Sequence, residues 1–148
     1  MGPVSAKIAI DVPREEIFEL LCDLSARPAF ADHLMESYHL LRIEPVGEGA
    51  GARFRLRDGG WVDSVIDEVE RPHRLVERGR GGHLNRIPNT TEWLLSETGG
   101  DGCEVQVTFW TDPSGPLDKM RDAKGSERRL GKGLRKLLER LREVAESG

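Results

Sequence analysis

Hydrophobic and polar residues alternate with a period of two over much of the chain. In residues 4–10 every second position is apolar, which is typical of a strand with one buried face. Similar short apolar or alternating segments, separated by glycine- and proline-containing turns, indicate further strands. We expect these strands at Tyr38–Glu44, Ala52–Arg57, Trp61–Val69, Leu75–Arg78, Thr91–Ser96 and Glu104–Thr111.

Two other parts of the chain have helical spacing instead. After Pro13, apolar residues recur at i, i+3, i+4 and i+7 from Ile17 to Leu24, which predicts an amphipathic helix. A second, short helix is expected at Pro28–His33. Near the end of the chain, an apolar stripe from Leu130 to Val144 predicts a helix of about 30 residues, bent or broken near Gly125 because glycine is a poor helix former.

The order of these elements is strand, two helices, six strands and a long helix. The connections are short, which favours an antiparallel sheet, and we expect one α+β domain over residues 1–148. A long helix with an apolar stripe buries that stripe on the sheet. Because a sheet that curls around one helix leaves a hollow between them, the pattern predicts an internal cavity, and such cavities are the usual ligand sites.

Four segments carry a family resemblance through their order and spacing. They are Ile8–Phe18, Val65–Val76, Trp93 followed by Gly102–Phe109, and Leu134–Glu146. Together they resemble the START-like (SRPBCC, Bet v 1-like) superfamily, and within it the bacterial polyketide cyclase/dehydrase-type domains. The resemblance implies a helix-grip fold, in which a curved seven-stranded antiparallel sheet wraps around a long C-terminal helix and two short helices follow the first strand.

The same resemblance implies a cavity for a small apolar or amphipathic molecule. Members of the superfamily include carriers of lipids and hormones, aromatic polyketide cyclases, and assembly or regulatory proteins. The fold therefore leaves the function open. A binding or carrier protein for a hydrophobic molecule such as a lipid or polyketide is our leading hypothesis, an aromatase/cyclase-type enzyme is the alternative, and a regulatory partner protein is the third.

The alternation also predicts which side chains face the cavity. If Phe54 points inward, a turn of two or four residues at Asp58–Gly60 places Trp61 and Asp63 on the same side. A bulge would reverse such an assignment, and the alternative is that the aromatic residues form a solid core while the carboxylates point to water. With His33 near the expected cavity mouth, the predicted ligand-binding residues are His33, Phe54, Trp61, Asp63, Glu77, Trp93, Leu95 and Phe109.

Cyclisation and dehydration chemistry would need a group that moves protons. A carboxylate inside an apolar cavity can do so at neutral pH. Glu77 is the first candidate for this role and Asp63 is the second, although a binding protein would use the same carboxylates only to orient its ligand.

Charge is distributed unevenly along the chain. The net charge of −4 and the pI near 5.6 disfavour a nucleic-acid-binding protein. Residues 118–142, however, contain ten Lys or Arg and four Asp or Glu, a net charge of +6. This basic segment predicts either a solvated helix face or a transient contact with an acidic protein or an anionic membrane surface.

The remaining patterns argue against several other classes of protein. Cys22 and Cys103 form no C-x-x-C motif and are expected to be free thiols in a reducing cytoplasm. The four histidines lack metal-site spacing, so we expect neither a metal nor a cofactor. The chain has no apolar run of about 18 residues and no secretory signal, which predicts a cytoplasmic protein. The sequence leaves open whether it is a monomer or a homodimer.

Overall fold

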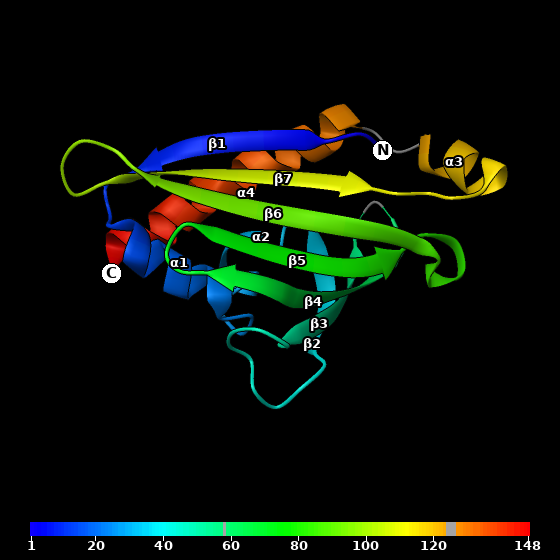
Figure 1. The fold of residues 1–148 in the computed structure, drawn as a ribbon, viewed down its shortest axis with the longest axis horizontal. Coiled ribbons are helices and arrows are strands. Elements are labelled where there is room, and N and C mark those ends of the chain that lie inside the picture. Colours follow the sequence, from blue (N-terminus) through cyan, green and yellow to red (C-terminus); the bar gives the residue numbers. More distant parts are fainter. Residues whose placement is uncertain (58, 124–126) are drawn as a thin grey trace.

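The computed structural model describes residues 1–57, 59–123 and 127–148 and contains one curved antiparallel sheet with helices on its concave side (Figure 1). The elements in chain order are β1 (Val4–Ile10), α1 (Arg14–Cys22), α2 (Pro28–Ala31), β2 (Met35–Leu40), β3 (Gly51–Leu56), β4 (Trp61–Glu70), β5 (Arg74–Gly81), the short η1 (His83–Asn85), β6 (Ile87–Glu97), β7 (Cys103–Thr111), α3 (Pro116–Ala123) and α4 (Glu127–Ser147).

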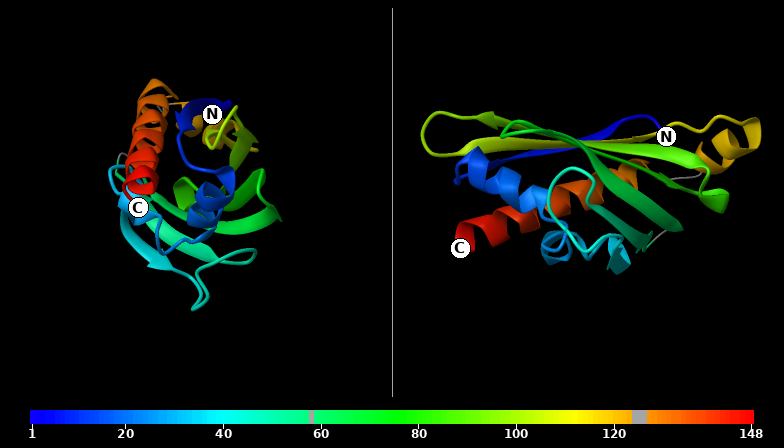
Figure 2. Two further views of the ribbon diagram at one scale, coloured as in Figure 1. Left: turned by 90° about the vertical axis from the view of Figure 1, so that its left-hand side faces the viewer. Right: turned by 60° about the horizontal axis from the view of Figure 1, so that its bottom comes forward.

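The seven strands follow the order β1-β7-β6-β5-β4-β3-β2, and every neighbouring pair is antiparallel. The first strand therefore lies beside the last, while the other strands follow one another as hairpins. The sheet curves around the space beside α4 (Figure 2). This arrangement confirms the predicted helix-grip fold.

The apolar stripe of α4 faces the sheet, as its spacing predicts. Leu134, Leu137, Leu138 and Leu141 are buried, and α4 lies against β1 and α2. In place of one helix of about 30 residues, the structure has α3 and α4. The expected bend or break near Gly125 lies outside the described residues.

One of the glycines in α4 has a packing role that the sequence pattern did not indicate. A Cβ atom at Gly133 would overlap the side chain of Leu34, in the segment that joins α2 to β2. Glycine thus costs helix propensity here but lets this segment approach α4 closely.

Two strand boundaries differ from the predicted ones. We predicted a strand at Tyr38–Glu44, but β2 is Met35–Leu40, and the apolar residues Leu41 and Ile43 lie exposed in the following loop. Here apolar character does not reflect burial. In the second case β6 begins at Ile87, four residues before the predicted start, because strand pairing continues through Pro88 despite its missing N–H group.

No helix among the described residues is long and apolar enough to cross a membrane.

Candidate ligand-binding cavity

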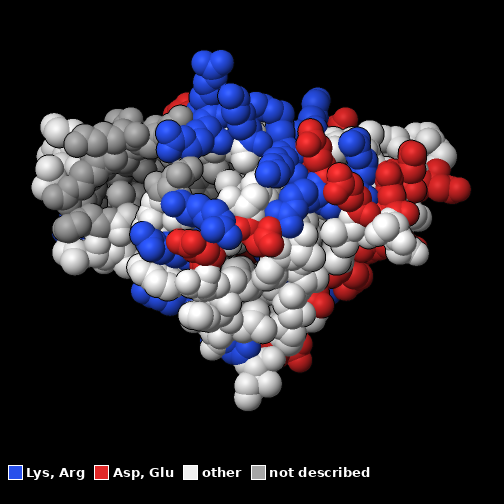
Figure 3. Space-filling view, turned by 180° about the vertical axis from the view of Figure 1, so that it is seen from behind, with Lys and Arg blue, Asp and Glu red and all other residues white. Residues whose placement is uncertain are grey.

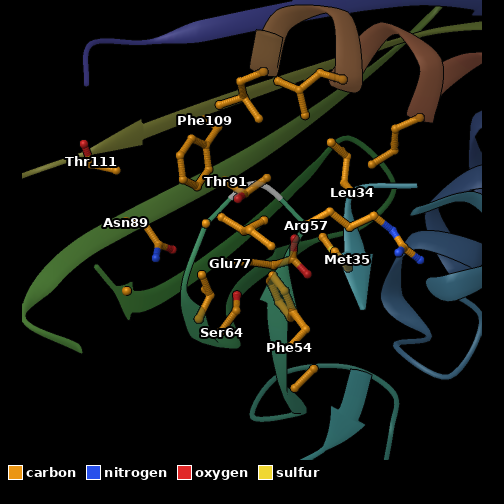
Figure 4. A pocket seen from close by; sticks show the side chains of 18 of the residues that line it. Leu34, Met35, Phe54, Arg57, Ser64, Glu77, Asn89, Thr91, Phe109 and Thr111 are labelled. Carbon is orange, nitrogen blue, oxygen red and sulfur yellow. The ribbon is translucent and has the colours of Figure 1, made fainter. Parts of the chain in front are cut away.

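A cavity of about 450 Å³ lies between the concave face of the sheet and α4. Leu130, Leu134 and Leu137 line it from the helix, and side chains of β3 to β7 line it from the sheet (Figure 4). Exposed residues, among them Arg57 and Gly60, line one end. The predicted hollow is therefore present, and it is mainly apolar.

The pairing of β3 with β4 decides which of their side chains reach the cavity. Phe54 pairs with Val62, and the N–H of Leu56 donates to the carbonyl oxygen of Gly60 at 3.1 Å. An odd number of residues separates this last pair, so even-numbered residues of both strands share the inner face. Val62 and Ser64 accordingly line the cavity with Phe54.

The prediction that Trp61 and Asp63 face the cavity is wrong, because it assumed a turn with an even number of residues. Trp61 is 39% exposed on the convex side of the sheet, where the guanidinium carbon of Arg53 lies 4.9 Å from its ring centroid. Arg53 Nη1 also donates to Asp63 Oδ1 at 2.9 Å, and Asn85 Nδ2 donates to Asp63 Oδ2 at 2.9 Å. We call Arg53, Trp61 and Asp63 the outer cluster.

Other predicted site residues do line the cavity: His33, Phe54, Glu77, Trp93 and Phe109. Leu95 is not among the lining residues. It is buried in the core farther along β6, where Arg14 Nη1 donates to its carbonyl oxygen at 3.4 Å. Contact between the lining residues and a ligand stays a prediction.

A buried ion pair forms part of the cavity wall. Arg27 Nη1 lies 2.9 Å from Glu77 Oε1 and 3.2 Å from Oε2, and Trp93 Nε1 donates to Oε2 at 2.9 Å. Arg27 Nη2 donates to the carbonyl oxygen of Leu21 at 2.9 Å. The guanidinium carbon of Arg27 lies 5.3 Å from the ring centroid of Trp93. We call Arg27, Glu77 and Trp93 the inner cluster.

The inner cluster changes the chemical interpretation of Glu77. Oε2 already accepts hydrogen bonds from Arg27 and Trp93, and Oε1 is ion-paired with Arg27. Arg27 and Glu77 are only 4% and 5% exposed. Glu77 is therefore an ion-paired carboxylate that Arg27 and Trp93 hold in place, and not a free carboxylate in an apolar pocket. Sequence reasoning missed Arg27 because it lies between α1 and α2, outside any periodic pattern.

Tyr38 adds a phenol to the cavity wall. Its ring stacks on Phe54, with centroids 5.8 Å apart and an interplanar angle of 17°. Burial raises the pKa of Tyr38 to about 12, so the group stays an uncharged phenol at neutral pH. Its expected position in a strand was correct, but its contact with the cavity was not predicted.

Three further polar residues reach the cavity from β4 and β6. Ser64, Asn89 and Thr91 line it, and no other described residue forms a hydrogen bond with their side chains (Figure 4). Asn89 was missed because β6 was predicted to begin at Thr91. Extending the alternation backwards from Trp93 would have placed Asn89 on the inner face.

His33 lines the cavity but uses both ring nitrogens to join helices. Nε2 donates to the carbonyl oxygen of Gly133 at 2.9 Å, and Arg140 Nη1 donates to Nδ1 at 2.9 Å. This pattern requires the neutral Nε2–H tautomer. The pKa of His33 is lowered, mainly by burial, which also favours the neutral ring. The contacts hold the end of α2 against α4.

Cysteine and metal chemistry have little support in this part of the molecule. Cys22 and Cys103 are free and buried, and burial raises the pKa of Cys22 to about 11, so its reactive thiolate is disfavoured. Among the residues that the structure describes, no group of three or more His, Cys, Asp or Glu side chains is placed to hold a metal ion.

The outward side of α4 is strongly basic. Lys and Arg side chains gather over one face of the molecule, while acidic side chains gather toward one end of it (Figure 3). Arg128, Lys132, Arg135 and Lys136 are exposed along the helix. Arg129 and Leu130, from the same helical segment, line the cavity, so the basic face adjoins one of its walls.

Comparisons with known proteins agree with this architecture. A hypothetical protein from Helicobacter pylori superposes with a TM-score of 0.76 at 16% identity, covering 97% of this chain and 88% of that one. A protein from Thermus thermophilus gives a TM-score of 0.75 at 19% identity, with coverages of 99% and 98%.

Norcoclaurine synthase from Thalictrum flavum, in a complex with a transition state analogue, gives a TM-score of 0.74 at 11% identity, with coverages of 99% and 94%. At these identities the likeness shows the fold alone. A comparison with curated proteins finds no match. Residues 1–146 match the family described as polyketide cyclase / dehydrase and lipid transport, and the chain therefore belongs to this family.

Proposed function

We propose that this protein binds a hydrophobic small molecule in its internal cavity and acts as a binding or carrier protein. The observation that carries the proposal is the cavity of about 450 Å³ between the sheet and α4. Its volume lies in the range of roughly 300–1,000 Å³ that is typical of small-molecule sites, and its lining is mainly apolar with a few polar groups. The family's association with lipid transport agrees with this function.

A cyclase-type enzyme is the second candidate, favoured by the family description. Such an enzyme would need a proton-transferring group beside the substrate. Glu77 reaches the cavity, but Arg27 and Trp93 already occupy its two oxygens. This arrangement supports binding over catalysis. If Glu77 is the catalytic group, Glu77→Gln abolishes turnover of a poly-β-ketone substrate while the folded protein persists.

The binding function is tested by native mass spectrometry of protein purified from its own host. We expect a bound small molecule that Ser64→Trp, which fills the cavity, displaces. Val65→Trp is the matched control, because Val65 lies on the outer face of the same strand and is not among the cavity-lining residues. Protein that is empty, and whose melting temperature does not respond to fatty acids, quinones or polyketides, would contradict the proposal.

The basic face of α4 supports a transient contact with an anionic membrane during ligand delivery. Exposed Lys and Arg side chains attract anionic lipid, and each contributes about 1 kcal/mol near such a surface. We expect the protein to float with vesicles that contain phosphatidylserine and not with neutral vesicles. Arg128→Glu/Lys132→Glu should abolish flotation, whereas Lys7→Glu/Arg42→Glu, with the same charge change elsewhere, should not.

A further inference from the structure

We propose that His33 is a pH-sensitive latch on the cavity. While its ring is neutral, it holds the segment that follows α2 against α4. When the ring takes up a proton, this segment separates from α4 and the cavity opens. Release of a ligand by this movement rests on the proposed binding function, whereas the state of the latch can be measured in the ligand-free protein.

The latch segment, residues 32–34, forms part of the cavity wall between α4 and the end of β3. His33 and Leu34 line the cavity, and Leu34 lies near Arg57 at its exposed end (Figure 4). On the β3 side, Arg57 Nε donates to the carbonyl oxygen of Asp32 at 2.8 Å, and the backbone N–H of Arg57 donates to that of Leu34 at 3.0 Å. These bonds do not involve the His33 ring, so this side stays attached whatever the charge of the ring.

On the α4 side, the segment is held by the His33 ring and by one apolar contact. His33 Nε2 donates to the carbonyl oxygen of Gly133, and Arg140 Nη1 donates to Nδ1, both at 2.9 Å. The side chain of Leu34 packs so closely on Gly133 that a Cβ atom there would overlap it. Attachment to α4 thus needs a ring that donates from one nitrogen and accepts at the other.

A proton on Nδ1 removes this acceptor and places two cations side by side. An imidazolium donates from both nitrogens, so the N–H of Arg140 would face another N–H. Lys136, on the same helix, adds positive charge nearby. The carbonyl oxygen of Gly133 and the carboxylate of Asp32 favour the charged ring, but burial and the two cations outweigh them, and the pKa of His33 is lowered.

The other charges around the latch segment do not compensate for the added proton. Asp32 is the adjacent carboxylate, but Arg140 already pairs with it. Arg57, at the end of β3, is a further cation, and Glu36 on β2 pairs with it at 3.2 Å. Because the pair between Asp32 and Arg140 persists when the ring is charged, we expect it to be the hinge of the movement.

The test measures how fast an uncharged fluorescent probe, N-phenyl-1-naphthylamine, leaves the cavity in stopped-flow dilution. Because the closed state has the lowered His33 pKa, it loses stability relative to the open state as the pH falls below about 6.5, by up to about 10-fold per pH unit. We expect dissociation to be about 5- to 10-fold faster at about pH 5.5 than at about pH 7.5. Ser64→Trp, which fills the cavity, should not bind the probe.

Two pairs of variants assign the effect to the latch. His33→Gln does not titrate, so its dissociation rate should be the same at both pH values, whereas His39→Gln, at an exposed position on β2, should keep the original response. Gly133→Ala displaces Leu34 from α4, and we expect fast dissociation already at neutral pH. Gly131→Ala is the matched control, because a Cβ atom there lies 3.7 Å from its nearest neighbours and displaces nothing.

NMR titration of the His33 ring gives a measurement without any ligand. We expect the ring to titrate below about 6.5 in the original protein and closer to 6.5 in Gly133→Ala, where the latch is open. A ring that titrates at or above 6.5 in the original protein overturns the latch. Absence of probe binding contradicts the binding function, and this titration then decides on the latch by itself.

The kinetic results separate the latch from the binding function. A dissociation rate that does not change with pH, or a pH response that survives in His33→Gln, overturns the latch and leaves the binding function intact. An unchanged rate in Gly133→Ala overturns the role of the Leu34 contact. If His33→Gln does not fold, faster dissociation in Gly133→Ala than in Gly131→Ala supports the latch, and equal rates in these two variants overturn it.

Discussion

The inner and outer clusters contain the same three kinds of side chain in two different environments. Each joins an arginine to a carboxylate, with an N–O distance of 2.9 Å, and places the guanidinium against a tryptophan ring. They differ in burial: the ion-paired side chains are 5–6% exposed in the inner cluster and 33–42% exposed in the outer one. Equal geometry therefore does not mean equal energy, because water screens the outer charges and is excluded from the inner ones.

Removing one charge from the inner cluster should have the largest effect. Glu77→Gln leaves Arg27 buried without a counter-charge, and we expect a loss of about 3–5 kcal/mol in the free energy of unfolding. Urea denaturation measures this loss. A change below about 1 kcal/mol would mean that water reaches the pair, and the contrast between the clusters would fail.

Replacing both inner charges should restore most of that stability. Arg27→Met/Glu77→Leu removes the ions together and replaces them with apolar side chains, which is often neutral or stabilising for buried pairs. We expect the free energy of unfolding of the double variant, measured by the same urea denaturation, to lie within about 1–2 kcal/mol of that of the original protein. A double variant as unstable as Glu77→Gln would show that the ion pair itself is essential for the packing.

The corresponding change in the outer cluster should be small. Arg53→Ala removes a half-exposed guanidinium, while Asn85 still donates to Asp63. We expect a loss of about 1 kcal/mol or less, part of it from lost contact with Trp61. A loss near that of Glu77→Gln would remove the distinction between the two clusters.

The smallest expected difference between the two clusters is in how their ion pairs respond to salt. Raising the ionic strength to 1 M shortens the screening length to about 3 Å, which weakens exposed ion pairs far more than buried ones. Double-mutant cycles should give a coupling between Arg53 and Asp63 that falls by a few tenths of a kcal/mol in salt. The coupling between Arg27 and Glu77 should change much less, and a parallel decrease would indicate that both pairs are exposed to solvent.

These two clusters also show how far sequence reasoning reaches. Alternation within one strand correctly placed Glu77 on the inner face of β5 and Trp93 on that of β6, because side chains of a strand alternate without exception unless a bulge intervenes. Alternation cannot relate one strand to the next, since that relation depends on the turn. The error in the turn moved Trp61 and Asp63 to the wrong face.

The pairing of Arg27 with Glu77 inside the inner cluster was harder to predict. Arg27 lies in an aperiodic connection and reaches Glu77 across 50 residues of sequence. No local pattern identifies such a pair. The overall fold, in contrast, follows from the order of the elements and from the apolar stripes, which is why the helix-grip architecture was predicted correctly although strand boundaries and several cavity residues were not.

The odd separation between Leu56 and Gly60 has a consequence for how this scaffold acquires new specificity. Deleting one residue before β4, with a turn of the same length re-formed between Leu56 and Trp61, would shift β4 by one residue against β3 and turn its opposite face to the cavity. An indole and a carboxylate would then enter the cavity in place of Val62 and Ser64. A change in chain length, without any change of amino acid in β4, would thus exchange the chemistry offered to a ligand.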